Sequence, residues 1–490
     1  MSAIKKFLGQ TAIYGVTTVV SRMFNFILTP LFTGVFQPAV YSIFTKMYAS
    51  ASLINAILAF GMESTYFRYL NKHEDKRQEV YNNSFFTVGF LSLLFLITGL
   101  LFAKPIAIHF STEPGQVTDY MSYVNYFVWL LFIDAICVIP FAKLRADGKP
   151  IRFSVIKFLN IGSFIGFNLF FLFVVPAIIR TESSIGHWCA SWYREGWIGY
   201  VFISNLIASV LTLLLLVPEL LKLKLKFDAE LFKKMFSYSW PVLIANLSFV
   251  VNENLDKMIL EPLGVSAYNL GVYGAVCKIA VFLSLFITAF RLGAEPFFFS
   301  HAKNANARTT YATVLNYFVV ALALIFVGLV ANIEILKHFI DKEYWVGLNA
   351  VPILLFGYVC LGIYSNLSIW YRLSDQTRYG LYISVIGAII TIVLNIVLVP
   401  VYGFMGSAWV SMLAYFVMMV ISYVLGQKNY PIPYNLKRIL WYMLVSIILV
   451  ALSFWVFNRN IYIGNVLFLV FIAGSFYAEK KELKQILKGK

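Results

Sequence analysis

Long apolar stretches dominate this chain and restrict its possible folds more than any other feature. Nearly every stretch exceeds the roughly 18 residues that a helix needs to cross about 30 Å of hydrocarbon, and short polar segments separate them. Only 13% of the residues are charged, whereas soluble domains carry about a quarter. Strands are excluded because membrane-barrel strands are about half as long and alternate in polarity. The chain is therefore expected to be an all-α polytopic membrane protein.

We expect about fourteen transmembrane helices. The predicted spans are 8–36, 39–63, 84–110, 120–142, 153–176, 197–217, 236–260, 268–292, 311–331, 348–371, 379–400, 404–425, 437–457 and 461–478. The longest outer loop, 177–196, is too short to fold alone. A membrane enzyme acting on sugars would usually place catalytic groups in such a loop or domain, so we expect no enzymatic activity and no catalytic residues.

An internal repeat indicates two related halves. Residues 26–67 align without a gap on residues 258–299, with 12 identities in 42 positions. The shared positions include Lys46 with Lys278 and Glu63 with Glu295. Six predicted helices separate the copies, so both halves cross the membrane in the same sense, which is typical of a parallel repeat. We expect two six-helix lobes around a central cavity, 1–221 and 222–430, followed by two helices and a basic tail in 431–490.

The basic residues are unevenly distributed across the expected topology. The net charge is +16, which could suggest a nucleic-acid partner. With a cytoplasmic N-terminus, however, 27 of the 39 Lys and Arg fall on the cytoplasmic side and only six on the other. This positive-inside bias explains the charge without nucleic acid and places both termini in the cytoplasm. The four cysteines show neither disulfide nor metal-ligand spacing.

Several cations fall inside the predicted spans. Arg22 lies 14 residues from either end of its span, too deep to reach water past lipid. Lys46 and Lys278 lie seven and ten residues into theirs. A charge at mid-bilayer costs roughly 2.5–3.5 kcal/mol unless it is paired or lines a wet cavity. The repeated lysines therefore indicate either a cationic cavity between the lobes or a packing device paired with Glu253 or Asp256.

The deep acidic residues permit two interpretations. Asp134 lies in the fourth predicted span, and Glu253 and Asp256 lie in the outer half of the seventh. A buried carboxylate can couple transport to H⁺ or to Na⁺, or it can neutralise a nearby cation. For Asp134 the two interpretations are equally favoured, and pairing is favoured for Asp256. Near the span ends, Lys157, Lys257 and Arg291 are expected to extend toward water.

Four segments carry a resemblance to a known family. They are AKLRADGKPIRF after the fourth span, GVYGAVCKIAVF in the eighth, and LNIVLVP followed by VYGFMGSAWVSMLAYFVMMVISYVLGQKNYPIPY. Together they resemble bacterial Wzx-type flippases of O-antigen and capsule repeat units, in the multidrug/oligosaccharidyl-lipid/polysaccharide exporter superfamily. The resemblance covers essentially the whole chain.

The resemblance implies both a function and a binding site. It implies translocation of undecaprenyl-diphosphate-linked oligosaccharides from the inner to the outer leaflet of the bacterial cytoplasmic membrane, for surface polysaccharides such as lipopolysaccharide. Arg22 resembles the family's cavity arginines, and Lys46, Lys278 and Arg291 occupy positions where cavity cations are common. The two C-terminal helices resemble helices that hold a polyprenyl tail. The implied partners are this lipid-linked substrate, membrane lipids and the polysaccharide polymerase machinery.

Two other functions stay open at this point. A multidrug cation antiporter of the same fold would favour acidic and aromatic groups in its cavity, and the deep basic excess argues against it. A membrane glycosyl polymerase or ligase would need a large outer loop, which 177–196 hardly provides. We expect no cofactor and no metal, and transport driven by H⁺, Na⁺ or the membrane potential.

Overall fold

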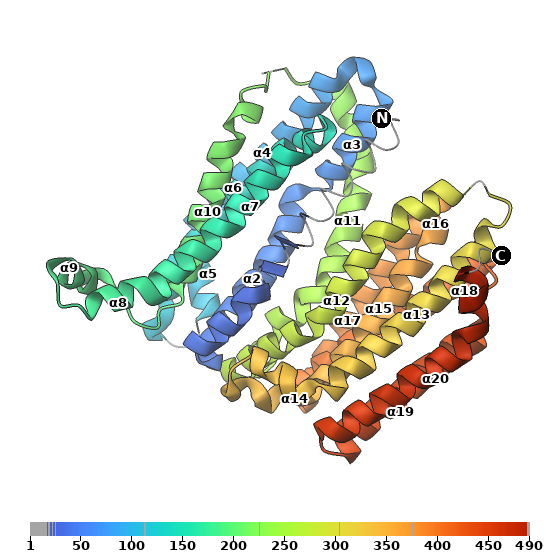
Figure 1. The fold of residues 1–490 in the computed structure, drawn as a ribbon. Helices are drawn as coiled ribbons and strands as arrows, with labels where there is room; N and C mark the ends of the chain where they lie inside the picture. The colour runs from blue at the N-terminus through green and yellow to red at the C-terminus, as the bar shows by residue number, and fades with distance from the viewer. Residues whose placement is uncertain are drawn as a thin grey trace. The chain divides into compact units, whose positions relative to one another are not determined.

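The chain folds into helices in the computed structural model (Figure 1), which describes residues 17, 20–21, 23–24, 26–111, 114–224, 226–302, 304–374 and 376–487. Helices, turns and short irregular segments make up these ranges, and no strand occurs in them. Two compact units divide the chain, Met1–Met258 and Ile259–Lys490. The all-α polytopic prediction is confirmed.

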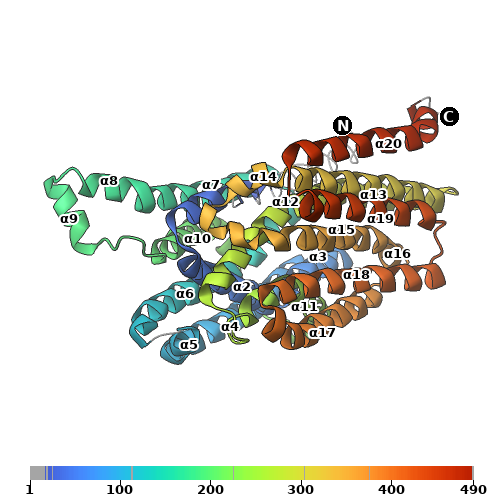
Figure 2. The same cartoon turned by 90° about the horizontal axis from the view of Figure 1, so that it is seen from below.

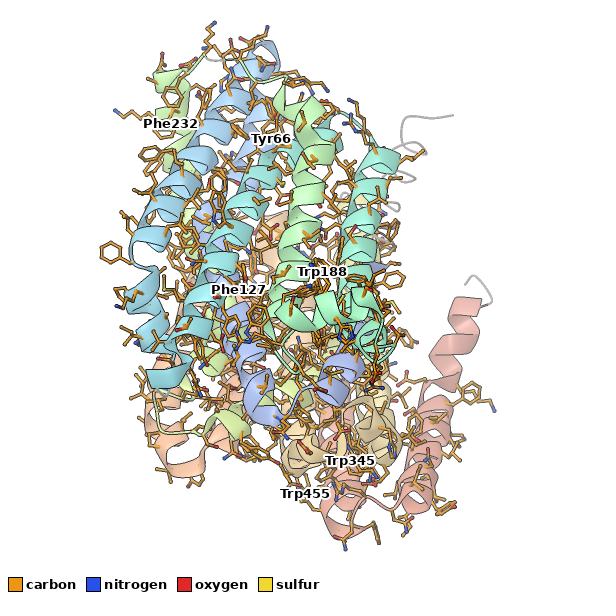
Figure 3. All side chains as sticks on the ribbon, turned by 90° about the vertical axis from the view of Figure 1, so that its left-hand side faces the viewer. Tyr66, Phe127, Trp188, Phe232, Trp345 and Trp455 are labelled. Atoms are coloured by element: carbon orange, nitrogen blue, oxygen red, sulfur yellow. The ribbon has the colours of Figure 1, made fainter. Side chains whose placement is uncertain are left out.

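The N-terminal unit is built from long apolar helices that pack side by side. Its helices are α2 (Pro38–Ala59), α3 (Met62–Lys72), η1 (Glu74–Lys76), α4 (Arg77–Leu101), α5 (Ala103–Phe110), η2 (Pro114–Gln116), α6 (Val117–Ala146), α7 (Pro150–Leu169), η3 (Phe170–Val174), α8 (Val175–Ile179), α9 (Ser184–Trp192), α10 (Gly199–Leu220) and α11 (Ala229–Ile259). Helix α6 is central, because α2, α4, α7 and α10 all pack against it. The short α9 follows α8 at one side of this unit, where Trp188 is 65% exposed (Figure 3).

The linker between α10 and α11 is held by polar side chains from the first turns of α4. Asn83 Nδ2 donates to the Asp228 carbonyl at 2.8 Å, and the Asp228 amide donates back to Asn83 Oδ1 at 3.1 Å. Asn82 Nδ2 donates to the Lys226 carbonyl at 3.0 Å, and Asn82 Oδ1 accepts from the Lys224 amide at 3.2 Å. Both asparagines are fully buried. The linker is therefore part of the N-terminal unit's packing.

The two compact units divide near the end of α11. The sequence places a lobe boundary at 221/222, whereas the contacts assign nearly all of α11 to the N-terminal unit. The lobe ranges 1–221, 222–430 and 431–490 stay a prediction.

Helices α2 and α3 are separated by a break at Phe60 and Gly61, both of which have positive φ. A Cβ on Gly61 would lie 2.9 Å from the carbonyl oxygen of Ser239 and 3.0 Å from Val242. Only glycine fits such a close approach at a φ of +63°. The equivalent Gly293 lies within a continuous helix, where an added Cβ would have no neighbour within 4 Å. The helix is therefore interrupted in the first copy of the repeat and continuous in the second.

The C-terminal unit repeats the plan of long packed helices. They are α12 (Ala267–His301), α13 (Ala307–Ala331), α14 (Ile333–Leu336), η4 (Lys337–Phe339), η5 (Lys342–Ala350), α15 (Val351–Leu367), α16 (Ile369–Leu373), α17 (Arg378–Tyr402), α18 (Phe404–Asn429), α19 (Leu436–Ala451), η6 (Leu452–Val456) and α20 (Ile461–Leu487). Helix α18 packs closely on α15, where a Cβ on Gly357 would lie 3.1 Å from the Cα of Met412. Helices α19 and α20 both pack against α13 (Figures 1 and 2).

Twelve helices within the described ranges are long and apolar enough to cross a membrane. The segment Phe26–Val35 is a shorter apolar helix, and the first predicted span, 8–36, lies partly outside the described residues. Helix α11 covers the seventh predicted span but carries Asn252, Glu253, Asn254, Asp256 and Lys257 near its end. The protein is therefore a multi-pass membrane protein, and the number fourteen stays a prediction.

Candidate functional site

A cavity of about 690 Å³ lies within the N-terminal unit, lined by residues of α2, α3, α6, α7, α10 and α11 and by Thr17 and Ser21. Its described polar lining consists of hydroxyls, amides, two carboxylates and two cations. These residues are Thr17, Ser21, Ser52, Asn55, Glu63, Asp134, Arg145, Lys157, Asn160, Asn205, Ser209, Thr212 and Asn246. So polar an interior in a membrane-spanning unit is a candidate binding site.

Helical periodicity brings these side chains to one wall. On α10, Asn205, Ser209 and Thr212 follow each other at intervals of four and three residues, so they share one face. On α7, Lys157 and Asn160 are spaced by three residues in the same way. The two helices pack against each other, and Asn160 Nδ2 donates to Thr212 Oγ1 at 2.9 Å. One wall of the cavity is therefore formed by the polar faces of α7 and α10.

Lys157 and Asp134 form the charged centre of this wall. Asp134 Oδ1 accepts a hydrogen bond from Ser209 Oγ at 2.6 Å. Asp134 and Lys157 also interact electrostatically. The ammonium of Lys157 lies 4.2 Å from the centre of the Phe141 ring, and Lys157 forms no ion pair with any described carboxylate. Its hydrogen-bond donors are thus available to a ligand in the cavity.

A second charged pair lies on the same cavity. Arg145 Nη1 donates to Glu63 Oε1 at 2.5 Å, and the Arg145 guanidinium lies over the Phe67 ring at 4.9 Å. With Asp134 and Lys157, the described lining holds two carboxylates and two cations. This cavity therefore has no net charge from its described lining, unlike the cationic cavity expected between the lobes.

The amides differ in how far the protein satisfies them. Asn205 Nδ2 donates to the Tyr48 hydroxyl at 2.8 Å, and Asn160 bonds within the wall. Asn55 and Asn246 make no hydrogen bond with another described residue. An amide offers both donors and acceptors, so these two side chains can bond to hydroxyl groups of a ligand.

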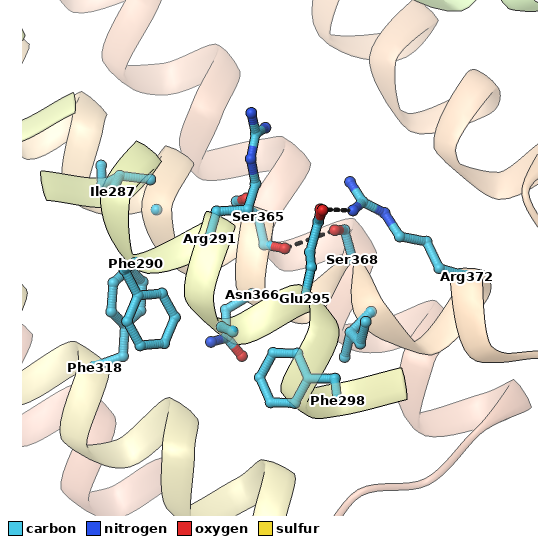
Figure 4. Close-up of a pocket in the computed structure, with 13 residues that line it drawn as sticks. Ile287, Phe290, Arg291, Glu295, Phe298, Phe318, Ser365, Asn366, Ser368 and Arg372 are labelled. Atoms are coloured by element: carbon cyan, nitrogen blue, oxygen red, sulfur yellow. Dashed lines mark hydrogen bonds and ion pairs between the residues drawn. The ribbon is translucent and has the colours of Figure 1, made fainter. Parts of the chain in front are cut away.

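A smaller pocket lies within the C-terminal unit, between α12, α13, α15 and α16 (Figure 4). Glu295 forms an ion pair with Arg372 on its wall. Phe290 and Phe318 stack at 4.0 Å between ring centroids and close its apolar side. Arg291 lines this pocket and is exposed. This pocket is much narrower and more apolar than the cavity of the N-terminal unit.

Both pockets contain a glutamate–arginine ion pair, and in both the glutamate belongs to the sequence repeat. Glu63 and Glu295 are equivalent in the alignment, and each pairs with an arginine near the end of a later helix of its own unit, Arg145 and Arg372. The sequence identified the glutamates but not their partners. Because the arginines lie outside the aligned segments, the repeat alone could not identify them.

The residues expected from the sequence are found in different places. Arg22 lies outside the described residues. Lys46 is buried, donates to the Phe110 carbonyl at 3.0 Å and lies over the Tyr120 ring at 4.8 Å. Lys46 does not line the cavity, whereas Asp134 does.

The remaining expected residues lie on α11 and α12. Glu253 is exposed, and the buried Asp256 forms an ion pair with Lys257 at 3.0 Å. Lys278 is half-buried on α12. These residues do not line the cavity of the N-terminal unit. Roles for Arg22, Lys46, Lys278 and Arg291 in substrate binding stay predictions.

Lys157, Arg145 and the asparagines are lining residues that the sequence did not predict. Lys157 lies near the end of its predicted span, and this shallow depth suggested that it extends to water. The sequence pattern that could have identified Lys157 is its helical spacing from Asn160, which places both side chains on one face of α7. That face packs against the polar face of α10. No group of three or more His, Cys, Asp or Glu residues that could hold a metal occurs among the described residues.

Comparison with known proteins agrees with this architecture. The family model described as polysaccharide biosynthesis protein matches residues 7–300, and the MatE model matches residues 241–397. An uncharacterized membrane protein of Methanocaldococcus jannaschii is 24% identical over 451 residues, covering 87% of this chain and 84% of that protein.

Two solved structures show the same fold at low sequence identity. The lipid II flippase MurJ in an inward closed conformation superposes with a TM-score of 0.71 at 16% identity, covering 96% of this chain and all of that one. An inward-facing multidrug resistance transporter of the MATE family gives 0.63 at 13% identity, over 86% of this chain and 95% of that one. Because the family model covers more than half of the chain, this protein belongs to the polysaccharide biosynthesis protein family.

Proposed function

We propose that this protein translocates undecaprenyl-diphosphate-linked oligosaccharides from the inner to the outer leaflet of the bacterial cytoplasmic membrane. The observation that carries the proposal is the cavity of the N-terminal unit, whose lining combines four amides and five hydroxyls with Lys157. Saccharides are recognised by such donor and acceptor groups, since each sugar hydroxyl both donates and accepts. The family to which the chain belongs supports the same substrate class.

Charge gives the second reason for this substrate. A diphosphate moving through hydrocarbon needs compensating cations, because burying an unpaired anion costs far more than a few kcal/mol. Lys157 would supply a charge-assisted hydrogen bond of the kind that phosphate oxygens accept. Arg22, Lys46, Lys278 and Arg291 are proposed as further cations along the transport path.

Coupling to an ion is proposed at Asp134. Its carboxylate lies on the cavity wall beside Ser209 and within the field of Lys157. Substrate entry or exit would change that field, and a carboxylate in such a site can exchange a proton or bind Na⁺. Both termini are proposed to be cytoplasmic, with polysaccharide polymerase machinery receiving the product.

Deletion of the gene in its native host tests this proposal. We expect loss of the surface polysaccharide, with lipid-linked oligosaccharides accumulating on the cytoplasmic leaflet, and restoration of both by the wild-type gene. Labelling intact and permeabilised cells with a membrane-impermeant sugar oxidant distinguishes the two leaflets. Normal polysaccharide on the deletion strain would contradict the proposal.

A cation antiporter is the second candidate function. Glu63 and Asp134 place two carboxylates on the cavity, and the MatE model matches residues 241–397. In that case expression should raise resistance to cationic dyes, and Asp134→Asn should abolish the resistance. Unchanged dye sensitivity on expression would exclude this candidate.

A further inference from the structure

A cluster of basic side chains surrounds one end of the helix pair α7 and α10, where α6 ends. It consists of four cations and two carboxylates, Lys143, Lys149, Arg152, Lys222, Asp147 and Glu219. None of these six residues lines the cavity. This basic cluster has two positive charges more than its own carboxylates can neutralise.

Glu219 pairs with three of the four cations in the cluster. Its side chain is fully buried, and its Oε1 accepts from Arg152 Nη1 at 2.8 Å and lies 3.7 Å from Lys149 Nζ. Its other oxygen pairs with Lys222. The Tyr81 hydroxyl fixes the Glu219 backbone by donating to its carbonyl at 2.8 Å. A single buried carboxylate therefore holds three cations close together.

The cationic groups themselves remain accessible. The side chains of Lys149, Arg152 and Lys222 are 39%, 37% and 42% exposed. A guanidinium has five N–H donors, and Arg152 directs only Nη1 to Glu219 and Nη2 to the Leu215 carbonyl at 3.4 Å. The remaining donors are free to bind an oxyanion, and the N-terminus of α7 adds a positive field.

Large apolar side chains flank these cations. Ile151 precedes Arg152 and is 73% exposed, and Leu221 precedes Lys222 and is 79% exposed. Along α7, Val155 and Leu159 continue the exposed apolar row from Ile151 at intervals of four residues. Only 17% of the most apolar stretch of the span Pro150–Ile179 is buried, and an exposed apolar row on a membrane-spanning helix is suited to contact with lipid.

We propose that the basic cluster binds the phosphate headgroup of an anionic membrane phospholipid, with an acyl chain along the apolar row of α7. The excess of positive charge selects an anionic phosphate, and the adjoining apolar row selects a lipid over a soluble anion. The site is on the lipid-facing surface of the N-terminal unit and does not depend on the proposed transport function. Each basic group near a membrane surface strengthens the binding of anionic lipid about 5-fold.

The test is a lipid titration of the purified full-length protein. Phosphatidylglycerol and phosphatidylcholine are added separately to protein in a neutral detergent, and bound lipid is counted by native mass spectrometry. We expect saturable binding of phosphatidylglycerol in preference to phosphatidylcholine. The double variant Arg152→Gln/Lys222→Gln should bind phosphatidylglycerol on the order of 30-fold more weakly.

Two further variants control for the loss of charge and for misfolding. The control Lys226→Gln/Lys234→Gln removes the same charge from two cations of the same unit that pair one-to-one with Glu79 and Glu230, and it should bind like wild type. Should the Arg152 variant fail to fold, Lys149→Gln leaves the two close partners of Glu219 in place and should weaken binding about 5-fold.

Three results would overturn the proposal. The first is equal binding of the two lipids by wild type. The second is equal loss of binding in the control and cluster variants. The third is displacement of bound phosphatidylglycerol by millimolar inorganic phosphate as effectively as by further phosphatidylglycerol. This result would assign the cluster to a soluble anion instead.

Discussion

Removal of the Asn83 side chain should release the linker between α10 and α11 from the N-terminal unit. Asn83→Ala deletes both hydrogen bonds to Asp228, at 2.8 and 3.1 Å. A lost hydrogen bond costs about 0.5–1.5 kcal/mol, and a buried partner left unsatisfied costs about 1–3 kcal/mol. Because Asp228 is only half-buried and can bond to water instead, the two lost hydrogen bonds should make local opening of the linker easier by about 1–3 kcal/mol.

Limited trypsin digestion measures this opening, because Lys222, Lys224 and Lys226 provide cleavage sites in the linker. When opening and closing are fast, the cleavage rate follows the population of the open form. At 1.4 kcal/mol for each tenfold change, cleavage of Asn83→Ala should accelerate on the order of 5- to 150-fold. The Asn429→Ala variant is the control, because Asn429 Nδ2 donates only to the Leu425 carbonyl of its own helix. Wild-type cleavage rates in a folded Asn83→Ala protein would refute the reasoning.

The remaining predictions concern the repeat and the pH dependence of the linker. Gly61→Ala should lower the free energy of unfolding by at least about 1–2 kcal/mol because of its positive φ, whereas Gly293→Ala should raise it by about 0.5–1 kcal/mol. Equal changes in the two variants would contradict the difference between an interrupted and a continuous helix. The backbone amide of Leu231 and the Lys76 ammonium hold the pKa of Asp228 below its ordinary value. The contribution of the ionised Asp228 carboxylate to stability is complete above about pH 4 and is lost as the pH falls through the lowered pKa. The melting-temperature difference between wild type and Asp228→Asn should therefore disappear at low pH. A difference that persists unchanged at pH 2 would contradict this assignment.

Hydropathy was sufficient to predict the all-helical membrane fold, because bilayer thickness fixes the length of an apolar run, but it did not predict short helices such as α5 and α9. The repeat also predicted that Glu63 and Glu295 are equivalent, and both pair with an arginine in their own unit. Their partners, Arg145 and Arg372, could not be predicted, because they come from helices outside the aligned segments.

The cavity was only partly predictable for a related reason. Depth along a span says how far a lysine lies from water but not toward which neighbour its helix face turns. Lys46 is deep and yet is bonded to the Phe110 carbonyl, whereas Lys157 is nearer a span end and lines the cavity. The face is set by the packing of α7 on α10, which depends on tertiary contacts. Asp134 was identified because a deep carboxylate is rare enough to stand out on any face.

The transport rate of a Lys157→Gln variant is the decisive test of the proposed substrate cavity. The assay follows dithionite quenching of a fluorescently labelled polyprenyl-diphosphate-linked saccharide in proteoliposomes. Loss of a charge-assisted hydrogen bond of about 1.5–3 kcal/mol predicts a rate about 10- to 150-fold lower than that of wild type.

Lys337→Gln is the matched control for this measurement. Lys337 lies over the Trp345 ring at 4.2 Å, as Lys157 lies over Phe141, but it pairs with Glu334 outside the cavity. We expect the Lys337 variant to transport at the wild-type rate and the Lys157 variant to lose transport while folding normally. Wild-type transport by a folded Lys157→Gln protein would contradict the assignment of this cavity to the anionic substrate.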